Sequence, residues 1–312
     1  MPRARLKVAL LAAEALSAAG AACVGYGILV ERDWYRLRRQ RVEALEPGQA
    51  PLTVLHLSDL HLTAADDRQM RFLERLAAEP VDLVVLTGDM LGEPGALGPV
   101  LDSLGRFRPR LGAVAVLGSN DYWAPRFRNP LTYFVGPSTR RHRSSGRNPW
   151  RELVSGLEAR GWTVLANRRA QLGDVELAGL DDPHIRRDDP AVAVPADGAR
   201  PSGGLGLSPP DPDPPRLRLG VVHSPYRRAL DAFAGNGYDL VLAGHTHGGQ
   251  VRLPGVGALV TNCDLPRDRV RGLSRWGSSW LHVSAGLGTS KYAPFRFACR
   301  PEASLLTVVP KP

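Results

Sequence analysis

Two histidines stand one residue apart in the segment LVLAGHTHGGQVRLP, where an apolar run meets a glycine-rich stretch. Alternate residues of a strand point to the same side, so His245 and His247 would face one point at the end of a buried strand. Gly244, Gly248 and Gly249 would let the backbone turn sharply there. Imidazoles presented in this way are common ligands for divalent metal ions. The segment therefore predicts a metal site at a strand tip.

Polar residues of the same kind follow four other hydrophobic runs. These blocks are Asp59-Leu60-His61, Gly88-Asp89, Gly118-Ser119-Asn120-Asp121 and His223. In an open α/β sheet a ligand site lies outside the carboxyl ends of the strands, so groups far apart in the sequence can converge there. Carboxylates, imidazoles and an amide together suit borderline divalent cations such as Mn²⁺, Fe²⁺ or Zn²⁺. No thiolate belongs to the set, which argues against a structural zinc knot.

Alternating strand and helix patterns would position these blocks. The apolar runs 52–62, 81–90 and 112–121 predict buried strands with polar ends, and the stretches between them have helical spacing. This βαβαβ order predicts a partly parallel sheet covered by helices. His56 and His282 fall within predicted strands and are expected to be core residues.

The composition limits the kind of protein. The chain has 312 residues, of which 43% are hydrophobic, enough for a sizeable core in an α/β domain. A net charge of +9 suggests anionic partners such as phosphorylated substrates or anionic lipid. Aromatic residues make up only 6% and do not interleave with the basic runs, which argues against nucleic acid as a partner. The scattered cysteines argue against a disulfide scaffold.

The segment VALLAAEALSAAGAACVGYGILV, residues 8–30, carries Glu14 as its single charge. At about 1.5 Å per residue it is long enough to cross a hydrocarbon core of about 30 Å. It predicts a signal-anchor helix and membrane association. A cleaved signal peptide and a buried soluble helix are the alternatives, because small residues permit cleavage and Glu14 is costly in lipid. The heavier basic flank, Arg32 to Arg41, follows the segment, so the positive-inside rule favours a cytoplasmic catalytic domain.

The order of the polar blocks resembles the calcineurin-like metallophosphoesterase superfamily, whose pattern runs D-x-H, G-D, G-N-H-D/E, H and G-H-x-H. The resemblance spans about residues 52–305, and four of the five blocks are intact. The segment GLDDPH and the tail resemble a bacterial branch that often carries an N-terminal membrane segment. The resemblance implies an α/β fold, a four-layer α/β/β/α sandwich of two mixed sheets flanked by helices, preceded by an N-terminal apolar helix. We expect residues 1–45 to form that helix and a lead-in strand, and residues 46–312 the metallophosphoesterase domain.

The resemblance also implies a centre of two divalent metal ions, Mn, Fe or Zn. By position, Asp59, His61 and His247 would bind the first ion, His223 and His245 the second, and Asp89 would bridge both. The ions would lower the pKa of a bridging water, and the resulting hydroxide would attack phosphorus in line. The expected reaction is hydrolysis of a phosphodiester, phosphomonoester or pyrophosphate bond in a phosphorylated small molecule or a phospholipid-like substrate. Asp89, Asn120 and His223 are the expected catalytic residues.

The third block departs from the family pattern, because GSND stands where G-N-H-D is expected. Either Ser119 takes the ligand position in an ungapped alignment, or the turn shifts by one residue and Asn120 coordinates the second ion. We favour Asn120, since an amide oxygen suits a hard cation better than a neutral hydroxyl. The histidine that assists the leaving group is absent in either case. A non-catalytic metal- or ligand-binding relative is therefore the alternative function.

Basic and titratable residues near the blocks are candidates for substrate binding. The Arg-rich insertion 126–149 follows the GSND block, and its Arg126 and Arg128 would bind an anionic substrate or a lipid headgroup. His184 ends another predicted strand and would contact the substrate. His142, His184 and Asp121 are also candidates to replace the missing histidine.

Overall fold

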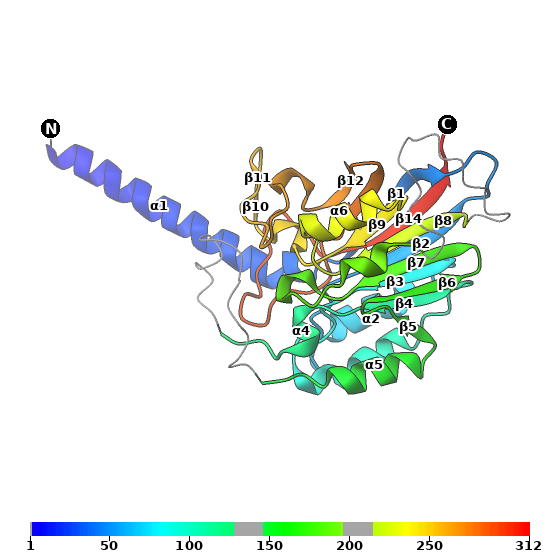
Figure 1. Ribbon diagram of the computed structural model, residues 1–312. Coiled ribbons are helices and arrows are strands. Elements are labelled where there is room, and N and C mark those ends of the chain that lie inside the picture. Colours follow the sequence, from blue (N-terminus) through cyan, green and yellow to red (C-terminus); the bar gives the residue numbers. More distant parts are fainter. Residues whose placement is uncertain (1, 128–145, 196–214) are drawn as a thin grey trace.

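The computed structural model describes residues 2–127, 146–195 and 215–312. Two six-stranded mixed sheets face each other, and helices cover their outer faces (Figure 1). The four-layer α/β/β/α sandwich predicted from the sequence is confirmed, together with the N-terminal apolar helix that precedes it.

The first sheet has the strand order β1-β14-β2-β3-β4-β5. Its strands are β1 (Arg36–Leu45), β14 (Glu302–Pro310), β2 (Leu52–Leu57), β3 (Leu83–Thr87), β4 (Gly112–Val116) and β5 (Trp162–Val164). Strands β2 to β5 are parallel to one another, β14 is antiparallel to β2, and β1 is parallel to β14. The first and last strands of the chain thus lie side by side.

The second sheet has the order β12-β13-β9-β8-β7-β6. Its strands are β12 (Gly272–Trp276), β13 (Ser279–Val283), β9 (Leu240–Ala243), β8 (Leu217–Val222), β7 (Val175–Leu180) and β6 (Arg168–Leu172). The four inner strands are parallel and the two edge strands antiparallel. A small ribbon of β10 (Arg252–Leu253) and β11 (Gly257–Ala258) extends beside it.

The inner strands are almost wholly apolar because both of their faces are buried. In β3, Val84 and Leu86 face the helices, whereas Leu83 and Val85 pack between the sheets. Helices α2 (Asp67–Ala77), α3 (Leu97–Leu104) and α5 (Trp150–Glu158) cover the first sheet, and α6 (Arg227–Gly235) covers the second. The single turn α4 (Ser119–Tyr122) follows β4 at the edge of the sandwich that carries the site.

The N-terminal helix α1 (Pro2–Leu29) projects away from the sandwich (Figure 1). The segment Ala13–Asp33 is long and apolar enough to cross a membrane, a test that a signal sequence also passes. The C-terminal end of α1 is docked on the domain. The backbone N–H of Arg296 donates to the Gly27 carbonyl, and the buried carboxylate of Glu31 accepts from the N–H groups of Ala298 and Cys299.

Candidate metal centre

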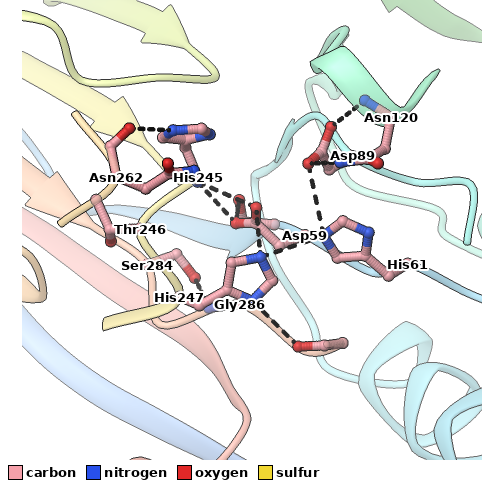
Figure 2. Close-up of polar contacts among 12 residues, drawn as sticks. Asp59, His61, Asp89, Asn120, His245, Thr246, His247, Asn262, Ser284 and Gly286 are labelled. Carbon is pink, nitrogen blue, oxygen red and sulfur yellow. Dashed lines mark hydrogen bonds and ion pairs between the residues drawn. The ribbon is translucent and has the colours of Figure 1, made fainter. Parts of the chain in front are cut away.

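The five polar blocks meet at one edge of the sandwich. Each block begins within two residues of the end of a strand, namely β2, β3, β4, β8 or β9. Two overlapping groups of potential ligands form there, Asp59 with His61 and His247, and Asp59 with Asp89 and His223. Within each group the ligand atoms all lie within 4.8 Å of one another. Figure 2 shows Asp59, His61, Asp89 and His247 turned toward a common space.

The Asp89 carboxylate lies between the two groups. Its Oδ2 atom is 3.5 Å from Nε2 of His61 and 3.4 Å from Nε2 of His223. Nε2 of His247 is 3.2 Å from Nε2 of His61 and 3.5 Å from Oδ1 of Asp59. Ligand atoms that are each about 2.1 Å from one ion are themselves about 3.0–3.5 Å apart. These separations therefore fit side chains that share a metal ion.

Three of the histidines are oriented by backbone carbonyl groups; His223 and His247 belong to the two ligand groups, and His245 belongs to neither. Nδ1 of His223, Nε2 of His245 and Nδ1 of His247 lie 2.6, 3.1 and 3.2 Å from backbone carbonyl oxygens. These carbonyls belong to Thr87, Asn262 and Gly288. A carbonyl only accepts, so these bonds place a proton on the nitrogens named. Nε2 of His223 is then left buried without a hydrogen-bond partner. Such support is typical of metal-ligating histidines, so the side chains present fit divalent cations.

The electrostatics of the cluster favour a bound cation. Burial raises the pKa of Asp59. Burial opposes the shift at Asp89, but the neighbouring His223 holds the pKa of this carboxyl well below its usual range. Burial likewise opposes the shift at His223, whose pKa is raised well above its usual value by Asp89. Burial lowers the pKa of His245 and His247, which keeps both rings neutral as ligation requires. Positive charge is thus stabilised among the carboxylates.

Five of the predicted ligands adopt left-handed backbone conformations. Their φ angles are 49° at Asp59, 42° at His61, 53° at Asp89, 67° at His245 and 50° at His247. Such conformations cost about 1–3 kcal/mol each for residues with side chains and cluster at functional sites.

Glycines allow the chain to pass close to the two carboxylates. A Cβ atom added to Gly118 would collide with Oδ1 of Asp89, and one added to Gly244 would collide with Oγ of Ser58. The same Gly244 Cβ would lie 2.6 Å from Oδ2 of Asp59. Both glycines are therefore required for close approach of neighbouring strand tips.

The GSND block places Asn120 directly against Asp89. The Asn120 backbone N–H donates to Oδ1 of Asp89 over 2.8 Å, and its side-chain amide donates to Oδ2 over 2.7 Å. Asp121 points elsewhere: its buried carboxylate accepts from four backbone N–H groups. The donors are Gly118, Asp89, Met90 and Leu91. Burial, reinforced by the Asp89 charge, raises the pKa of Asp121 to about 7. Asp121 thus holds the Asp89 loop in place and is not turned toward substrate.

A buried chain of hydrogen bonds extends from Asp59 into the sandwich. The Ser58 hydroxyl lies 2.5 Å from Oδ2 of Asp59, and Thr87 Oγ1 lies 2.7 Å from Ser58 Oγ. His56 bonds Thr87 through Nε2 over 2.9 Å and His282 through Nδ1 over 2.8 Å. His282 ends the chain at the amide of Gln40, 3.2 Å away.

The two ends of this chain have defined donors. The Ser58 hydroxyl donates to Asp59. At the other end Oε1 of Gln40 faces Nε2 of His282, so this ring nitrogen donates, and Nδ1 of His282 accepts from Nδ1 of His56. The predicted core positions of His56 and His282 are confirmed, and the two rings also connect the Asp59 carboxylate with β1.

The predicted substrate-binding residues differ in where they lie. The ring of His184 is 4.6 Å from that of His245, centroid to centroid, and its Nδ1 lies 3.0 Å from the Tyr226 hydroxyl. Arg126 is exposed one residue before the end of the described segment at residue 127, and Arg128 and His142 lie outside the described residues. His184 is thus the member of this set that stands beside the predicted ligands.

Sequence reasoning missed Arg296, which is completely buried beside the centre. Its guanidinium donates to the carbonyls of Ala285, Gly286, Gly288 and Cys299. This loop carries the Gly288 carbonyl that bonds His247, and Gly286 packs against the Asp59 side chain. The only signal is one arginine in the apolar stretch PFRF, which does not distinguish a buried guanidinium from an exposed one.

Comparison with known proteins agrees with this geometry. A family model described as calcineurin-like phosphoesterase matches residues 52–249. Phosphodiesterase YaeI of Escherichia coli (strain K12) is 27% identical over 314 residues, covering 96% of this chain and 97% of that protein. The metallophosphoesterase YkoQ of Bacillus subtilis (strain 168) is 27% identical over 266 residues, covering 83% and 84%.

Among solved structures, the phosphopantetheinyl hydrolase PptH from Mycobacterium tuberculosis aligns with 87% of this chain and 98% of that chain at 14% identity. The TM-score is 0.39, too low to carry an argument. The match to the family model does support an assignment, because it covers more than half of the sequence and includes all five polar blocks. The chain belongs to the calcineurin-like phosphoesterase family.

Proposed function

We propose that the protein is a metal-dependent phosphodiesterase with a two-metal centre. The observation that carries the proposal is the convergence of Asp59, Asp89 and His223 with His61 and His247 around one space. The proposed ligands of the first ion are Asp59, His61 and His247; those of the second are His223, His245 and Asn120; Asp89 is shared. When bound, two divalent cations would activate water near neutral pH and stabilise charge on the phosphoryl oxygens.

The protein's own groups would keep this centre preorganised. The backbone carbonyls behind His223, His245 and His247 fix the ring orientations, so the lone pairs need not reorient on binding. Asn120 bonds both oxygens of Asp89 and would stay at that corner, turning its amide oxygen toward the second ion. His184 stands beside His245, where an imidazole could protonate a leaving group.

The proposed substrate is a phosphodiester of a small molecule or a phospholipid-like compound. The relative YaeI is named a phosphodiesterase, which favours this bond type. A cavity of about 320 Å³ is lined in part by Tyr122, which follows Asn120 by two residues in the sequence. We propose that this cavity holds the organic part of the ester. It is lined by Tyr122, Trp123, Arg147, Trp150, Arg151 and Arg187. Aromatic faces and guanidinium groups together suit a planar or anionic substituent.

The test is hydrolysis of bis-p-nitrophenyl phosphate with added Mn²⁺, with metal content measured by mass spectrometry on the same samples. The matched control is Asp89→Asn, which keeps the side-chain shape and removes the charge. We expect turnover by the wild-type protein and none above background by the variant. Two tightly held metal ions without turnover on any ester would instead establish a non-catalytic metal-binding protein.

The N-terminal helix would hold the enzyme at a membrane, with the catalytic domain on the cytoplasmic side. Support comes from the apolar segment Ala13–Asp33, from the exposed side chains of Leu11, Leu16 and Leu29, and from the basic residues that follow α1. Fractionation of cells expressing the full chain tests this: the protein should sediment with membranes and resist extraction by carbonate. Recovery in the soluble fraction, with α1 intact, would rule out the anchor.

A further inference from the structure

A second cavity, lined by arginines, lies apart from the metal ligands. Its volume is about 610 Å³, and its lining consists of Arg36, Leu37, Arg38, Arg252 and Arg271. Arg36 and Arg38 begin β1, the edge strand of the first sheet, and Arg271 precedes β12, the edge strand of the second. The cavity thus lies where the edges of both sheets meet. None of the proposed metal ligands lines it.

The charges around this cavity do not balance. Arg36 and Arg271 share Oε2 of Glu302, at 2.6 and 2.5 Å, and Arg38 lies 3.8 Å from Oε1 of the same carboxylate. The Glu302 side chain is completely buried beneath them. Arg252 donates to the Gly248 carbonyl, which carries no charge. Among the ion pairs of the described residues, Glu302 is the single carboxylate that pairs with these arginines, and it contacts three of the four, which leaves an excess of three positive charges.

Several polar atoms at this place also lack partners. Nε of Arg271, a donor, and Oγ of Ser304, which can donate, are buried without a hydrogen bond; Oε1 of Glu302 also has none, but as an acceptor it would not bind an anion. Ser304 pairs with Arg38 in the register of β14 with β1. The positive charge of Arg38 and Arg271 is felt as far as His282, where it adds to the effect of burial in lowering the pKa. Buried donors and uncompensated charge in one place indicate a missing anion.

We propose that this arginine cavity binds the phosphate group of a phosphorylated ligand, at a site distinct from the hydrolytic centre. Guanidinium forks match phosphate oxygens in pairs, and a phosphate dianion would neutralise two of the three excess charges. The volume falls within the range of small-molecule sites and leaves room for a group attached to the phosphate.

The site adjoins the metal centre through a single turn. Arg252 bonds the Gly248 carbonyl, and a Cβ atom on Gly248 would lie 3.2 Å from the Cδ atom of Arg271. Gly248 directly follows the proposed ligand His247. Arg36, the first residue in the sequence that lines the site, follows the end of α1 at Leu29 by seven residues. The phosphate could therefore come from a soluble compound or from the headgroup of an anionic lipid, and the test has an arm for each.

The experiment uses the full chain in detergent, with a chelator present so that the metal centre cannot bind anions. Binding of inorganic phosphate and of dihexanoyl phosphatidic acid is measured by calorimetry and by the shift in melting temperature. The variant Arg38→Gln/Arg252→Gln is compared with Arg39→Gln/Arg41→Gln, which removes the same charge from the outer face of β1. Losing two charge-assisted contacts should weaken binding by roughly 10- to 100-fold in the first variant and leave it unchanged in the second.

The two ligands distinguish the sources. Tighter binding of the lipid phosphate, lost in Arg38→Gln/Arg252→Gln, would assign the site to a headgroup, and equal or tighter binding of inorganic phosphate would assign it to a soluble compound. Binding of neither ligand, or wild-type affinity in the cavity variant, would overturn the proposal. If the melting temperature of Arg38→Gln/Arg252→Gln is already lowered without ligand, the single variant Arg252→Gln is used in its place, because Arg252 does not touch Glu302. Turnover of a phosphodiester is not measured, so failure here is separable from failure of the proposed function.

Discussion

Asn120 bonds both carboxylate oxygens of Asp89, one through its backbone N–H at 2.8 Å and the other through its side-chain amide at 2.7 Å. It occupies the block in which the family pattern has a histidine. An amide does not titrate in the ordinary pH range, so Asn120 can orient Asp89 but cannot deliver a proton to a leaving group. At this corner of the site the Asn120 side chain thus orients Asp89 and offers no titratable proton.

Removing the Asn120 side chain should weaken the centre at the second ion. We expect Asn120→Ala to slow esters with good and poor leaving groups alike by about 10- to 100-fold, because a proposed metal ligand is lost and not a proton donor. The measurement is the dependence of rate on the pKa of the leaving group, whose slope should stay unchanged. Asn120→Asp, which keeps an oxygen at this position, is the matched control and should retain more activity. A changed slope in Asn120→Ala would contradict the proposed ligand role.

Removing the Ser58 hydroxyl should weaken metal binding at Asp59. In Ser58→Ala the Oδ2 atom of Asp59 loses its side-chain donor, and the chain through Thr87 and His56 ends on an apolar group. We expect the affinity for Mn²⁺ to fall by about tenfold, in the manner of other residues that support metal ligands. Titration calorimetry on metal-free protein measures this. Ser155→Ala, at an exposed position on α5, is the control, and equal affinities in the two variants would contradict the prediction.

The protein should lose stability in acid partly because of His282. Burial and the charges of Arg38 and Arg271 lower the pKa of His282 to about 3, whereas the unfolded chain has a value near 6.5. Between these values the unfolded state binds one more proton than the native state, so the free energy of unfolding falls with falling pH by about 1.4 kcal/mol per unit. Denaturant unfolding with a chelator present should show that slope reduced by this amount in His282→Gln. Equal slopes in both proteins would refute the assignment.

An alanine at position 118 should disrupt the centre without touching any proposed ligand. A Cβ atom there would collide with Oδ1 of Asp89, so the carboxylate or the strand tip must move. We expect Gly118→Ala to lower turnover by at least about 10²-fold, because displacements near 1 Å are costly in active sites. Gly98→Ala in α3, where nothing lies within 4 Å of the new atom, should be neutral or slightly stabilising. Comparable activity of the two variants would count against the geometry of the Asp89 loop.

The buried parallel strands and the convergence of the blocks were predictable from periodicity, whereas the four layers were predicted from the resemblance to the family. Apolar runs ending in polar blocks predict buried parallel strands, and parallel strands bring their carboxyl ends to one edge. Asp59, His61, Asp89, His223 and His247 meet there for that reason. The individual roles of these residues remain predictions.

Other features depend on contacts that periodicity does not encode. The left-handed backbone at Asp59 and Asp89 arises from how each tip packs on its neighbours. The buried state of Arg296 depends on three carbonyl groups of the irregular loop 285–288 and on the carbonyl of Cys299. The charge excess of the arginine cavity comes from β1 and from a segment more than two hundred residues later. Such arrangements become visible only when both sheets are assembled.

The segment that joins α1 to the domain is held by hydrogen bonds along most of its length. Glu31 holds the N–H groups of Ala298 and Cys299, and β1 then pairs with β14 residue by residue from Arg36 onward. On the proposed membrane anchor, such a joint would hold the domain at one height and one tilt above the lipid. The depth at which a phosphate ester sits in the bilayer, more than its diffusion through water, would then decide whether it is cleaved.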